Sequence, residues 1–411
     1  MEGLHRGELR VLRGPGLAGW RLQDRQGGEG RHVRGRPAAA RRGPLNRPAA
    51  VSARLPEFTW DALDAAARTA AAHPGGLINL SMGTPVDPVP PVIQAALIGA
   101  ADSPGYPLTA GTPALRAAIT AWVRRACGAA EGFGVLPTIG SKELVGWLPT
   151  LLGIGPGDTV VVPRVCYPTY ADGAQLAGAE VLRTDSLTAV GPTPRVRLIW
   201  VNSPGNPTGR VLPAAHLRKV VDWARERGVV VASDECYLPL GWEVEPVSVL
   251  SPEVCGGSYD GVLAVHSLSK RSNLAGYRAG FVAGDPTLVA ELLKVRKHVG
   301  MIVPAPVQAA MVAALGDEEH ATAQRDRYAA RRVRLAEAFT AAGFTIDHSE
   351  AGLYLWVTRG EECWRSVGWL AERGILAAPG VFYGPGGEQH VRVALTESDE
   401  RIAAVPDRLR H

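Results

Sequence analysis

The segment that most limits the fold of this chain runs from one apolar stretch, LIWVN at residues 198–202, to a second, VVVAS, that ends directly before Asp234. Between them, a segment that starts after Pro213 repeats apolar residues at i, i+3, i+4 and i+7 from Leu217 to Ala224, which is the spacing of an amphipathic helix. This order predicts a strand, a helix and a strand. The two strands are then expected to be parallel and joined by a right-handed crossover.

Parallel strands end at one edge of a sheet, and open α/β sheets bind their ligands at that edge. Asn206 follows the first strand, and Asp234 ends the second. A third apolar run, GVLAVHS, ends at Ser267 and is followed by Lys270. The sequence therefore predicts an α/β fold in which an amide, a carboxylate and an amine lie along one rim.

The composition excludes several other classes of protein. Apolar residues make up 46% of the 411-residue chain and charged residues 20%, and no apolar run is long enough to cross a bilayer. The opening residues lack the apolar core of a secretion signal. The five cysteines are scattered, without the spacing of a metal site or a disulfide framework. We therefore expect no metal ion and a reducing, cytoplasmic location.

Positive charge is concentrated in residues 1–50, which hold 11 arginines against four acidic residues. The rest of the chain is slightly acidic, so the overall basic charge does not indicate a nucleic-acid-binding protein. The Arg- and Gly-rich composition of residues 1–50 predicts a disordered extension. Two alternatives stay open: an arm that binds RNA or a membrane surface, and upstream sequence outside a natural protein that begins near Val51.

Residues 267–280 read SLSKRSNLAGYRAG, so that Lys270 is bracketed by small and hydroxylated residues. Three further motifs also follow predicted strands: GSK at 140–142, NPTG at 206–209 and DECY at 234–237. Together these motifs resemble those of the class I/II aminotransferases, the fold type I enzymes that use pyridoxal 5′-phosphate. The resemblance covers the chain from about residue 55 to its end. It implies a mostly parallel sheet with helices on both faces, and a smaller α+β domain.

We expect four regions on this basis. Residues 1–50 form the extension, residues 51–85 an arm that contributes to the small domain, residues 86–298 the large cofactor-binding domain and residues 299–411 the small domain.

The resemblance assigns the chemistry of the cofactor ring to four residues. Lys270 would bind the cofactor covalently and, once released by the incoming amine, serve as the base. Asp234 would hold the proton on the pyridine nitrogen. Glu235 offers the same chemistry, but neighbouring strand residues point to opposite faces, and the family pattern favours Asp234. Asn206 and Tyr237 would donate hydrogen bonds to the 3-oxygen of the ring.

The phosphate of the cofactor requires a site for an anion. The helix predicted to begin at Gly140 offers free N–H groups and a favourable dipole. By resemblance, Ser141 and the amides of its neighbours Gly140 and Lys142 bind the phosphate, with help from Ser267 and Arg278. Arg278 as a surface salt-bridge residue is the alternative.

Other residues would stack on the ring or contact the substrate. Tyr167 matches the aromatic residue that stacks on the cofactor, although a packed core tyrosine is the alternative. Arg392, in HVRVAL, matches the residue that binds the α-carboxylate of the substrate, with Asn206 beside it. Gly83, in SMGTP, matches the strip that closes over the substrate. Tyr106 matches a tyrosine that reaches the cofactor phosphate of a partner subunit, which implies a homodimer.

Within the family, the segments VLPTIGSKELV and EAGLYLW are most similar to the actinobacterial succinyldiaminopimelate aminotransferases. This resemblance implies amino transfer between N-succinyl-L,L-2,6-diaminopimelate and 2-oxoglutarate, in lysine and cell-wall precursor synthesis. Another amino-acid aminotransferase, such as one for aspartate, and a C–S lyase of the same fold are the alternatives. The cations available for the distal carboxylates are expected to be mostly solvated. They are Lys142, Arg271, Arg296 and Lys297.

Overall fold

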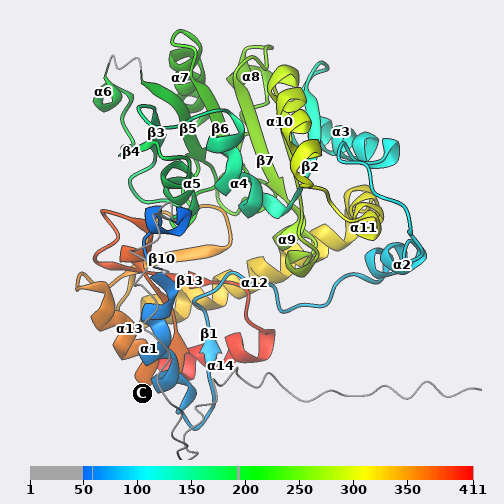
Figure 1. Cartoon of the computed structure of the whole chain (residues 1–411). Coiled ribbons are helices and arrows are strands. Elements are labelled where there is room, and N and C mark those ends of the chain that lie inside the picture. Colours follow the sequence, from blue (N-terminus) through cyan, green and yellow to red (C-terminus); the bar gives the residue numbers. More distant parts are fainter. Residues whose placement is uncertain (1–49, 58, 192–194, 411) are drawn as a thin grey trace, which may run out of the picture. The chain divides into compact units, whose positions relative to one another are not determined.

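The computed structural model describes residues 50–57, 59–191 and 195–410 (Figure 1). The extension expected for residues 1–50 thus falls, except for its last residue, outside the described residues. Among the helices described, none combines the length and the apolar character that a bilayer span requires.

Seven strands form the main sheet, in the order β2-β8-β7-β6-β5-β3-β4. Strand β8 is antiparallel to both of its neighbours, and the other pairings are parallel. The predicted α/β fold with a mostly parallel sheet is therefore confirmed. The strands are β2 (Gly134–Ile139), β3 (Thr159–Val162), β4 (Glu180–Arg183), β5 (Val196–Asn202), β6 (Val230–Asp234), β7 (Val262–Ser267) and β8 (Ala279–Gly284).

Helices cover both faces of this sheet, because alternate residues of each strand point to opposite faces. In β6, Val231 packs into the core on one face and Ala232 into the core on the other. The first core includes residues of α2 (Pro91–Gly99), α3 (Pro113–Cys127), α6 (Leu187–Val190), α7 (Ala214–Arg225), α8 (Pro252–Cys255) and α11 (Ala305–Gly316). The second includes residues of α4 (Gly140–Leu151), α5 (Thr169–Ala177) and α10 (Pro286–Val299).

The helix of the predicted β-α-β unit is present. Helix α7 begins directly after Pro213, contains the apolar positions from Leu217 to Ala224, and ends at Arg225, three residues before Gly228, which adopts a positive φ of 63°. The strand after it, β6, runs parallel to β5 with Asn202 opposite Asp234. The carboxyl ends of these two strands therefore meet at one edge, as the sequence predicted.

A second, antiparallel sheet has the order β12-β13-β10-β9 and lies among C-terminal elements (Figure 1). N-terminal residues join this part of the chain, because β1 pairs in parallel with β11 and α1 packs against α13. These pairings support our proposal of a small domain from residues 51–85 and 299–411 beside a large domain over residues 86–298. Its strands are β1 (Ile78–Asn79), β9 (Thr345–Asp347), β10 (Tyr354–Thr358), β11 (Ile375–Leu376), β12 (Ala378–Pro379) and β13 (His390–Ala394). Its helices are α1 (Asp64–Ala71), α12 (Glu319–Ala341), α13 (Cys363–Glu372) and α14 (Asp399–Arg410).

Short helices complete the chain. Helix α9 (Leu268–Arg271) follows β7, and the 3₁₀ turns span Val51–Arg54, Thr59–Leu63, Ala275–Tyr277 and Gly380–Tyr383.

Candidate active site

Asp234, the last residue of β6, carries a buried carboxylate at the ligand edge of the main sheet. Each of its two oxygens accepts one hydrogen bond: the Tyr170 hydroxyl donates to Oδ2 at 2.7 Å, and the backbone N–H of Cys236 donates to Oδ1 at 3.1 Å. Burial raises the pKa of Asp234, while the contacts with Cys236 and Tyr170 lower it. These two donors fix the orientation of the carboxylate and leave further lone pairs for a ligand N–H.

Lys270 lies in α9, one short turn beyond β7. Its ammonium donates a hydrogen bond to the backbone oxygen of Gly83. Burial lowers the pKa of Lys270, and the nearby Arg392 and Arg278 lower it further. Burial and the charge of Asp234 raise the pKa of the Cys236 thiol, and the charge of Lys270 lowers it, so this thiol is in the electrostatic field of both groups.

The N-terminus of α4 lies against Arg278, which follows the 3₁₀ turn Ala275–Tyr277. Gly140 has a φ of +72°, and a Cβ atom there would lie 2.4 Å from Nη2 of Arg278, so only glycine fits. Arg278 itself adopts a φ of +58°, a conformation that is uncommon outside glycine. The next residue of α4, Ser141, contacts the Cys236 thiol. The first N–H groups of this 12-residue helix therefore lie in the same region as a guanidinium.

Ser267 has a local structural role at the start of α9. Its hydroxyl accepts a hydrogen bond from the backbone N–H of Ser269 at 3.1 Å, which caps the helix that carries Lys270.

Arg392 of β13 is fully buried and reaches the same edge from the second sheet. It donates to Oδ1 of Asn206 at 2.9 Å and to the backbone oxygen of Ser81 at 2.6 Å, while its Nε has no hydrogen-bond partner among the described residues. Because the Asn206 oxygen is used in this way, its N–H groups remain available as donors. The ring of Tyr354 lies 3.9 Å from the guanidinium carbon of Arg392, which is a cation–π contact.

Tyr237 and Tyr354 share a hydrogen bond between their hydroxyl oxygens, 3.1 Å apart. Gly83 packs directly against Tyr354, since a Cβ atom at Gly83 would lie within 2.2 Å of the tyrosine oxygen. Tyr354 thus joins Tyr237, Arg392 and Gly83 into one contact group.

Three other predicted site residues, Tyr167, Lys142 and Tyr106, lie in surroundings that differ from one another. Tyr167 packs edge-on against Tyr170, with ring centroids 5.7 Å apart. The Lys142 ammonium lies 6.0 Å from the centre of the Tyr167 ring. Tyr106 is fully exposed and does not join the site within this chain. Tyr167, Lys142 and Arg392 all line one cavity of about 140 Å³.

Comparison with known proteins defines the family of the chain. Residues 76–409 match the family model described as aminotransferase class I and II. The chain is a class I/II aminotransferase.

Two relatives are especially similar to this aminotransferase in sequence. It is 60% identical, over the full length of both chains, to a probable aminotransferase of Mycobacterium tuberculosis. It is 58% identical to the 4-dedimethylamino-4-oxo-anhydrotetracycline transaminase of Streptomyces rimosus, over 86% of this chain and 99% of the relative. Among solved structures, a probable N-succinyldiaminopimelate aminotransferase from Thermus thermophilus matches with a TM-score of 0.78 and 29% identity, over 86% of this chain and 99% of that one.

Class I/II aminotransferases depend on pyridoxal phosphate. The residues of this site suit that cofactor. The buried Asp234 carboxylate has lone pairs for a ring N–H, and the pKa of Lys270 is lowered, which favours a reactive amine. Because Gly140 has no side chain, the Arg278 guanidinium can lie against the start of α4, where it and the N–H groups of the helix would hold an anion.

Sequence reasoning missed three residues of this aminotransferase site. Tyr170 holds the Asp234 carboxylate, and Tyr354 joins the tyrosine and arginine groups described above. The side-chain oxygen of Asn202 accepts a hydrogen bond from the backbone N–H of Asn206 at 2.7 Å. The side-chain nitrogen of Asn202 donates to the Asp234 backbone oxygen at 2.8 Å. Tyr170 lies three residues after Tyr167, and Tyr354 lies within EAGLYLW, so their positions beside features already identified in the sequence were the available signal.

The expectation that the candidate cations for a distal carboxylate are mostly solvated was wrong for two of the four. Arg296 is fully buried and binds both oxygens of Glu143, at 2.9 and 3.1 Å. Arg271 is buried and pairs with Glu318 at 2.7 Å. Buried arginines require such acidic partners, and neither guanidinium is therefore available to a substrate. Lys142 and Lys297 are exposed.

Glu235 points to the opposite face of the sheet from Asp234, as the alternation of the strand predicts. Its carboxylate accepts from the Ser248 hydroxyl at 2.6 Å and from the Val249 N–H at 2.8 Å. Together with His266 and Cys127 it forms a buried cluster whose possible ligand atoms lie within 4.8 Å of one another. Burial raises the pKa of Glu235 to about 7 and lowers that of His266 to about 3.

Replacing Glu235 with glutamine is expected to change how stability depends on pH. Because burial raises the pKa of Glu235 from 4.5 to about 7, the folded protein binds more protons than the unfolded chain across this range, and its stability falls as the pH rises. Relative to Glu235→Gln, the unmodified protein should lose about 3 kcal/mol between pH 4.5 and 7. Denaturant unfolding at a series of pH values measures this difference.

His266 lies 3.6 Å from Glu235, but burial lowers its pKa to about 3, so in the folded state its ring is neutral between pH 4.5 and 7 in both proteins. Glu180→Gln, which alters an exposed carboxylate of β4, serves as the control and should follow the unmodified protein at each pH. Parallel profiles for Glu235→Gln and the unmodified protein would show that Glu235 does not titrate in this range.

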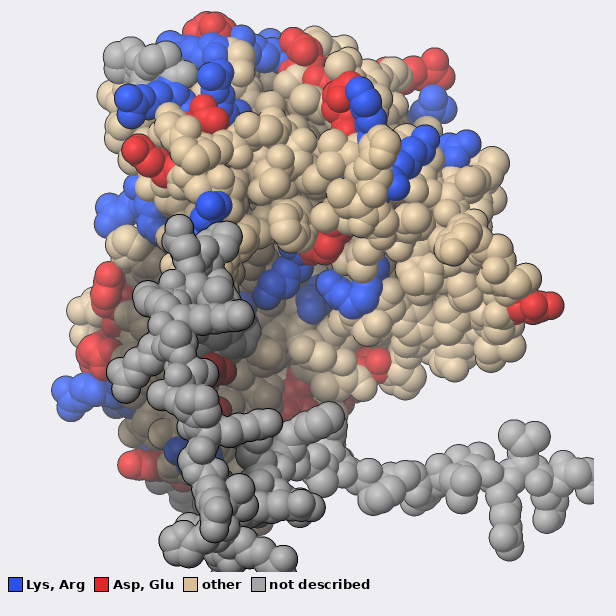
Figure 2. Space-filling view, viewed as in Figure 1, with Lys and Arg blue, Asp and Glu red and all other residues tan. Residues whose placement is uncertain are grey.

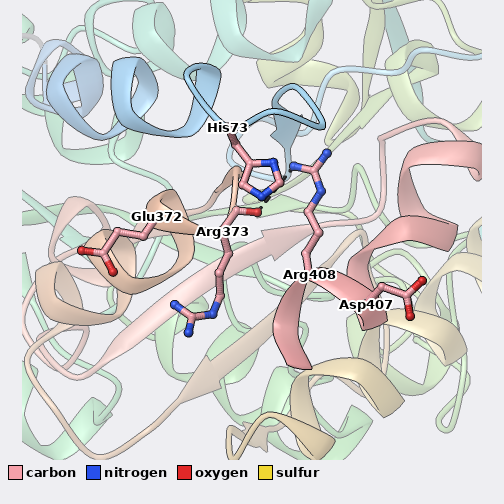
Figure 3. A pocket seen from close by; sticks show the side chains of 5 residues that line it. All are labelled: His73, Glu372, Arg373, Asp407 and Arg408. Carbon is pink, nitrogen blue, oxygen red and sulfur yellow. Dashed lines mark hydrogen bonds between the residues drawn. The ribbon is translucent and has the colours of Figure 1, made fainter. Parts of the chain in front are cut away.

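A second cavity, of about 510 Å³, lies between the residues that follow α1 and the ends of α13 and α14 (Figure 3). Its lining includes His73, Arg373 and Arg408. Arg408 donates hydrogen bonds to the backbone oxygens of residues 75, 76 and 374. It therefore links an N-terminal segment to two C-terminal ones. None of the residues that line this cavity is a predicted site residue, and we assign it no part in amino transfer.

Proposed function

We propose that this aminotransferase exchanges an amino group between N-succinyl-L,L-2,6-diaminopimelate and 2-oxoglutarate. The observation that carries amino transfer is the convergence of Asp234 of β6, Lys270 of α9 and Arg392 of β13 at one edge of an aminotransferase fold. The choice of donor is supported by the motifs of the sequence and by the similarity to the Thermus thermophilus structure.

Bound pyridoxal phosphate supplies an electron sink for the Cα–H bond of the amino acid. In our proposal, Asp234 would accept the N–H of the ring, and Asn206 and Tyr237 would donate to the ring oxygen. Lys270 would hold the cofactor covalently and would move the proton at Cα of the substrate.

The remaining groups bind the two anions, the phosphate of the cofactor and the α-carboxylate of the substrate. The N-terminal amides of α4 and Ser141 bind the phosphate, with Arg278 as a guanidinium fork. Ser267 assists, while it also caps α9. Arg392 binds the α-carboxylate and so orients the Cα–H bond, an effect of positioning rather than of acidity.

We also propose that the active form is a homodimer in the cytoplasm. Apolar side chains are exposed on α2 and the loop before α3, with Ile98 at 71% and Tyr106 fully exposed. Figure 2 shows a broad area with few charged side chains over α2 and α11. A second copy would cover these apolar groups and bring Tyr106 to the neighbouring phosphate. All five cysteines are free, which suits a reducing compartment. Sedimentation of the loaded enzyme tests the dimer.

The 58% identity to the Streptomyces rimosus transaminase favours a second candidate, amino transfer to the ketone of a polycyclic anhydrotetracycline. A panel of donors with 2-oxoglutarate as acceptor, and of ketones with glutamate as donor, separates the two. We expect the highest kcat/KM with N-succinyl-L,L-2,6-diaminopimelate. A preference for aspartate or for the polycyclic ketone would reject this donor while leaving amino transfer intact. Release of pyruvate and ammonia from a sulfur amino acid would instead indicate a lyase.

A further inference from the structure

The cavity of about 140 Å³ beside Arg392 is where the remainder of an amino donor must extend if Arg392 binds its α-carboxylate. One side is formed by Tyr167, Lys142 and Asp172, and the other by N-terminal residues that include Glu57 and Trp60. Trp60 also lies over Arg392, with 5.7 Å between the ring centre and the guanidinium carbon. The cavity is therefore continuous with the proposed carboxylate site.

Lys142 is the cation in this cavity that is available to a distal anion. Of the four cations that the sequence offered, Arg271 and Arg296 are committed to buried acidic partners, and Lys297 is not part of the lining. Lys142 forms no ion pair within 4 Å among the described residues, and its recorded contact is with the Tyr167 ring. Its side chain can thus turn towards a carboxylate.

Asp172, in the first turn of α5, is a half-buried carboxylate in the same lining. Burial raises its pKa, and the charges of Lys142 and Arg183 lower it. Within the described part of the chain its side chain accepts no hydrogen bond. A carboxylate that is partly removed from water without a donor is unfavourable, and an N–H group from a ligand would satisfy it.

We propose that Lys142 and Asp172 form a subsite for the distal end of the amino donor, which carries both a carboxylate and an N–H group on one carbon. Lys142 binds the carboxylate, and Asp172 accepts the N–H. This inference rests on the proposed function and narrows its substrate class to long α-amino acids with a second amino-acid-like end. The distal nitrogen is an amide in N-succinyl-L,L-2,6-diaminopimelate and an ammonium in the unacylated compound.

Four donors of equal main-chain length separate these contributions. N-succinyl-L,L-2,6-diaminopimelate and L,L-2,6-diaminopimelate have both distal groups, L-2-aminopimelate has only the carboxylate, and L-2-aminoheptanoate has neither. The rate of the cofactor-loaded enzyme with 2-oxoglutarate gives kcat/KM for each donor.

The donor ratio is kcat/KM for a donor with a distal nitrogen divided by kcat/KM for L-2-aminopimelate. For Asp172→Ala, we expect this ratio to fall by about 10-fold or more for whichever of the two nitrogen-bearing donors the unmodified enzyme prefers. Asp172→Asn separates the two nitrogens. An amide N–H can still donate to the asparagine oxygen, so its ratio should fall less than for Asp172→Ala. In Asp172→Asn, the ammonium of L,L-2,6-diaminopimelate loses the negative charge opposite it. The donor ratio for this compound should therefore fall about as far as in Asp172→Ala.

For Lys142→Met, we expect kcat/KM for L-2-aminopimelate to fall by about 10-fold or more relative to L-2-aminoheptanoate. This ratio removes any effect of the substitution on the cofactor, because both donors use the same loaded enzyme.

Matched controls are Asp326→Ala on α12 and Lys219→Met on α7, which alter exposed side chains outside the cavity. Their donor ratios should equal those of the unmodified enzyme. Unchanged ratios in the Asp172 and Lys142 variants would overturn the subsite while leaving the proposed amino transfer intact. An unmodified enzyme that transaminates none of the four donors would overturn the proposed function and the subsite together.

Discussion

Lys270→Ala is expected to remove the visible absorbance of the covalent link between protein and cofactor and to lower kcat/KM for amino transfer by about 10⁴-fold or more. The amine of Lys270 donates to the Gly83 backbone oxygen, and burial lowers its pKa, which favours nucleophilic attack and proton transfer. A positioned general base contributes up to about 10⁴-fold, and the covalent bond to the cofactor is lost as well. Visible absorbance and steady-state rates measure the two effects.

Lys294→Ala, which alters an exposed lysine of α10, is the control and should keep both colour and rate. A Lys270→Ala protein that transaminates at the normal rate would end the mechanism proposed here.

Asp234→Ala should lower kcat/KM by about 10²–10³-fold, equivalent to about 3–4 kcal/mol of transition-state stabilisation, because a preorganised charge at the ring nitrogen is removed. Asp234→Asn removes the charge and keeps one oxygen that can accept from Tyr170, while its NH2 group replaces the oxygen that accepts from the Cys236 N–H. We expect a loss of similar size in both variants.

Tyr170→Phe provides the comparison for Asp234, because it removes the hydroxyl that orients the carboxylate but keeps the charge. Its loss should be smaller than that of Asp234→Asn. Near-normal turnover of Asp234→Asn would reject the role of this carboxylate.

Strand and helix periodicity was sufficient to predict the parallel unit of β5, α7 and β6, because apolar runs such as LIWVN end at polar residues that the parallel topology brings together. Asn202 lies opposite Asp234 in the β5–β6 pairing, as such a unit requires. Periodicity could not show how Tyr354 contacts Arg392, since these residues belong to paired strands of the second sheet, whose register no local pattern determines.

Charged side chains were harder to place from the sequence. Arg296 looks like a solvated helix residue, and only the fold reveals that it reaches Glu143, 153 positions away in the chain. Tyr106 is the opposite case, because it resembles a site residue yet lies on the surface of this chain. Its predicted role depends on a second subunit.

Two consecutive acids stand at the end of β6, Asp234 as its last residue and Glu235 directly after it, and their tasks differ only through the face that each one occupies. Inserting one amino acid upstream of Asp234 within β6 would exchange those faces, turning the first acid towards the His266 and Cys127 side of the sheet. Length variation in this strand should consequently be far more damaging than most single substitutions in it, and a deletion scan across residues 229–233 would reveal that intolerance.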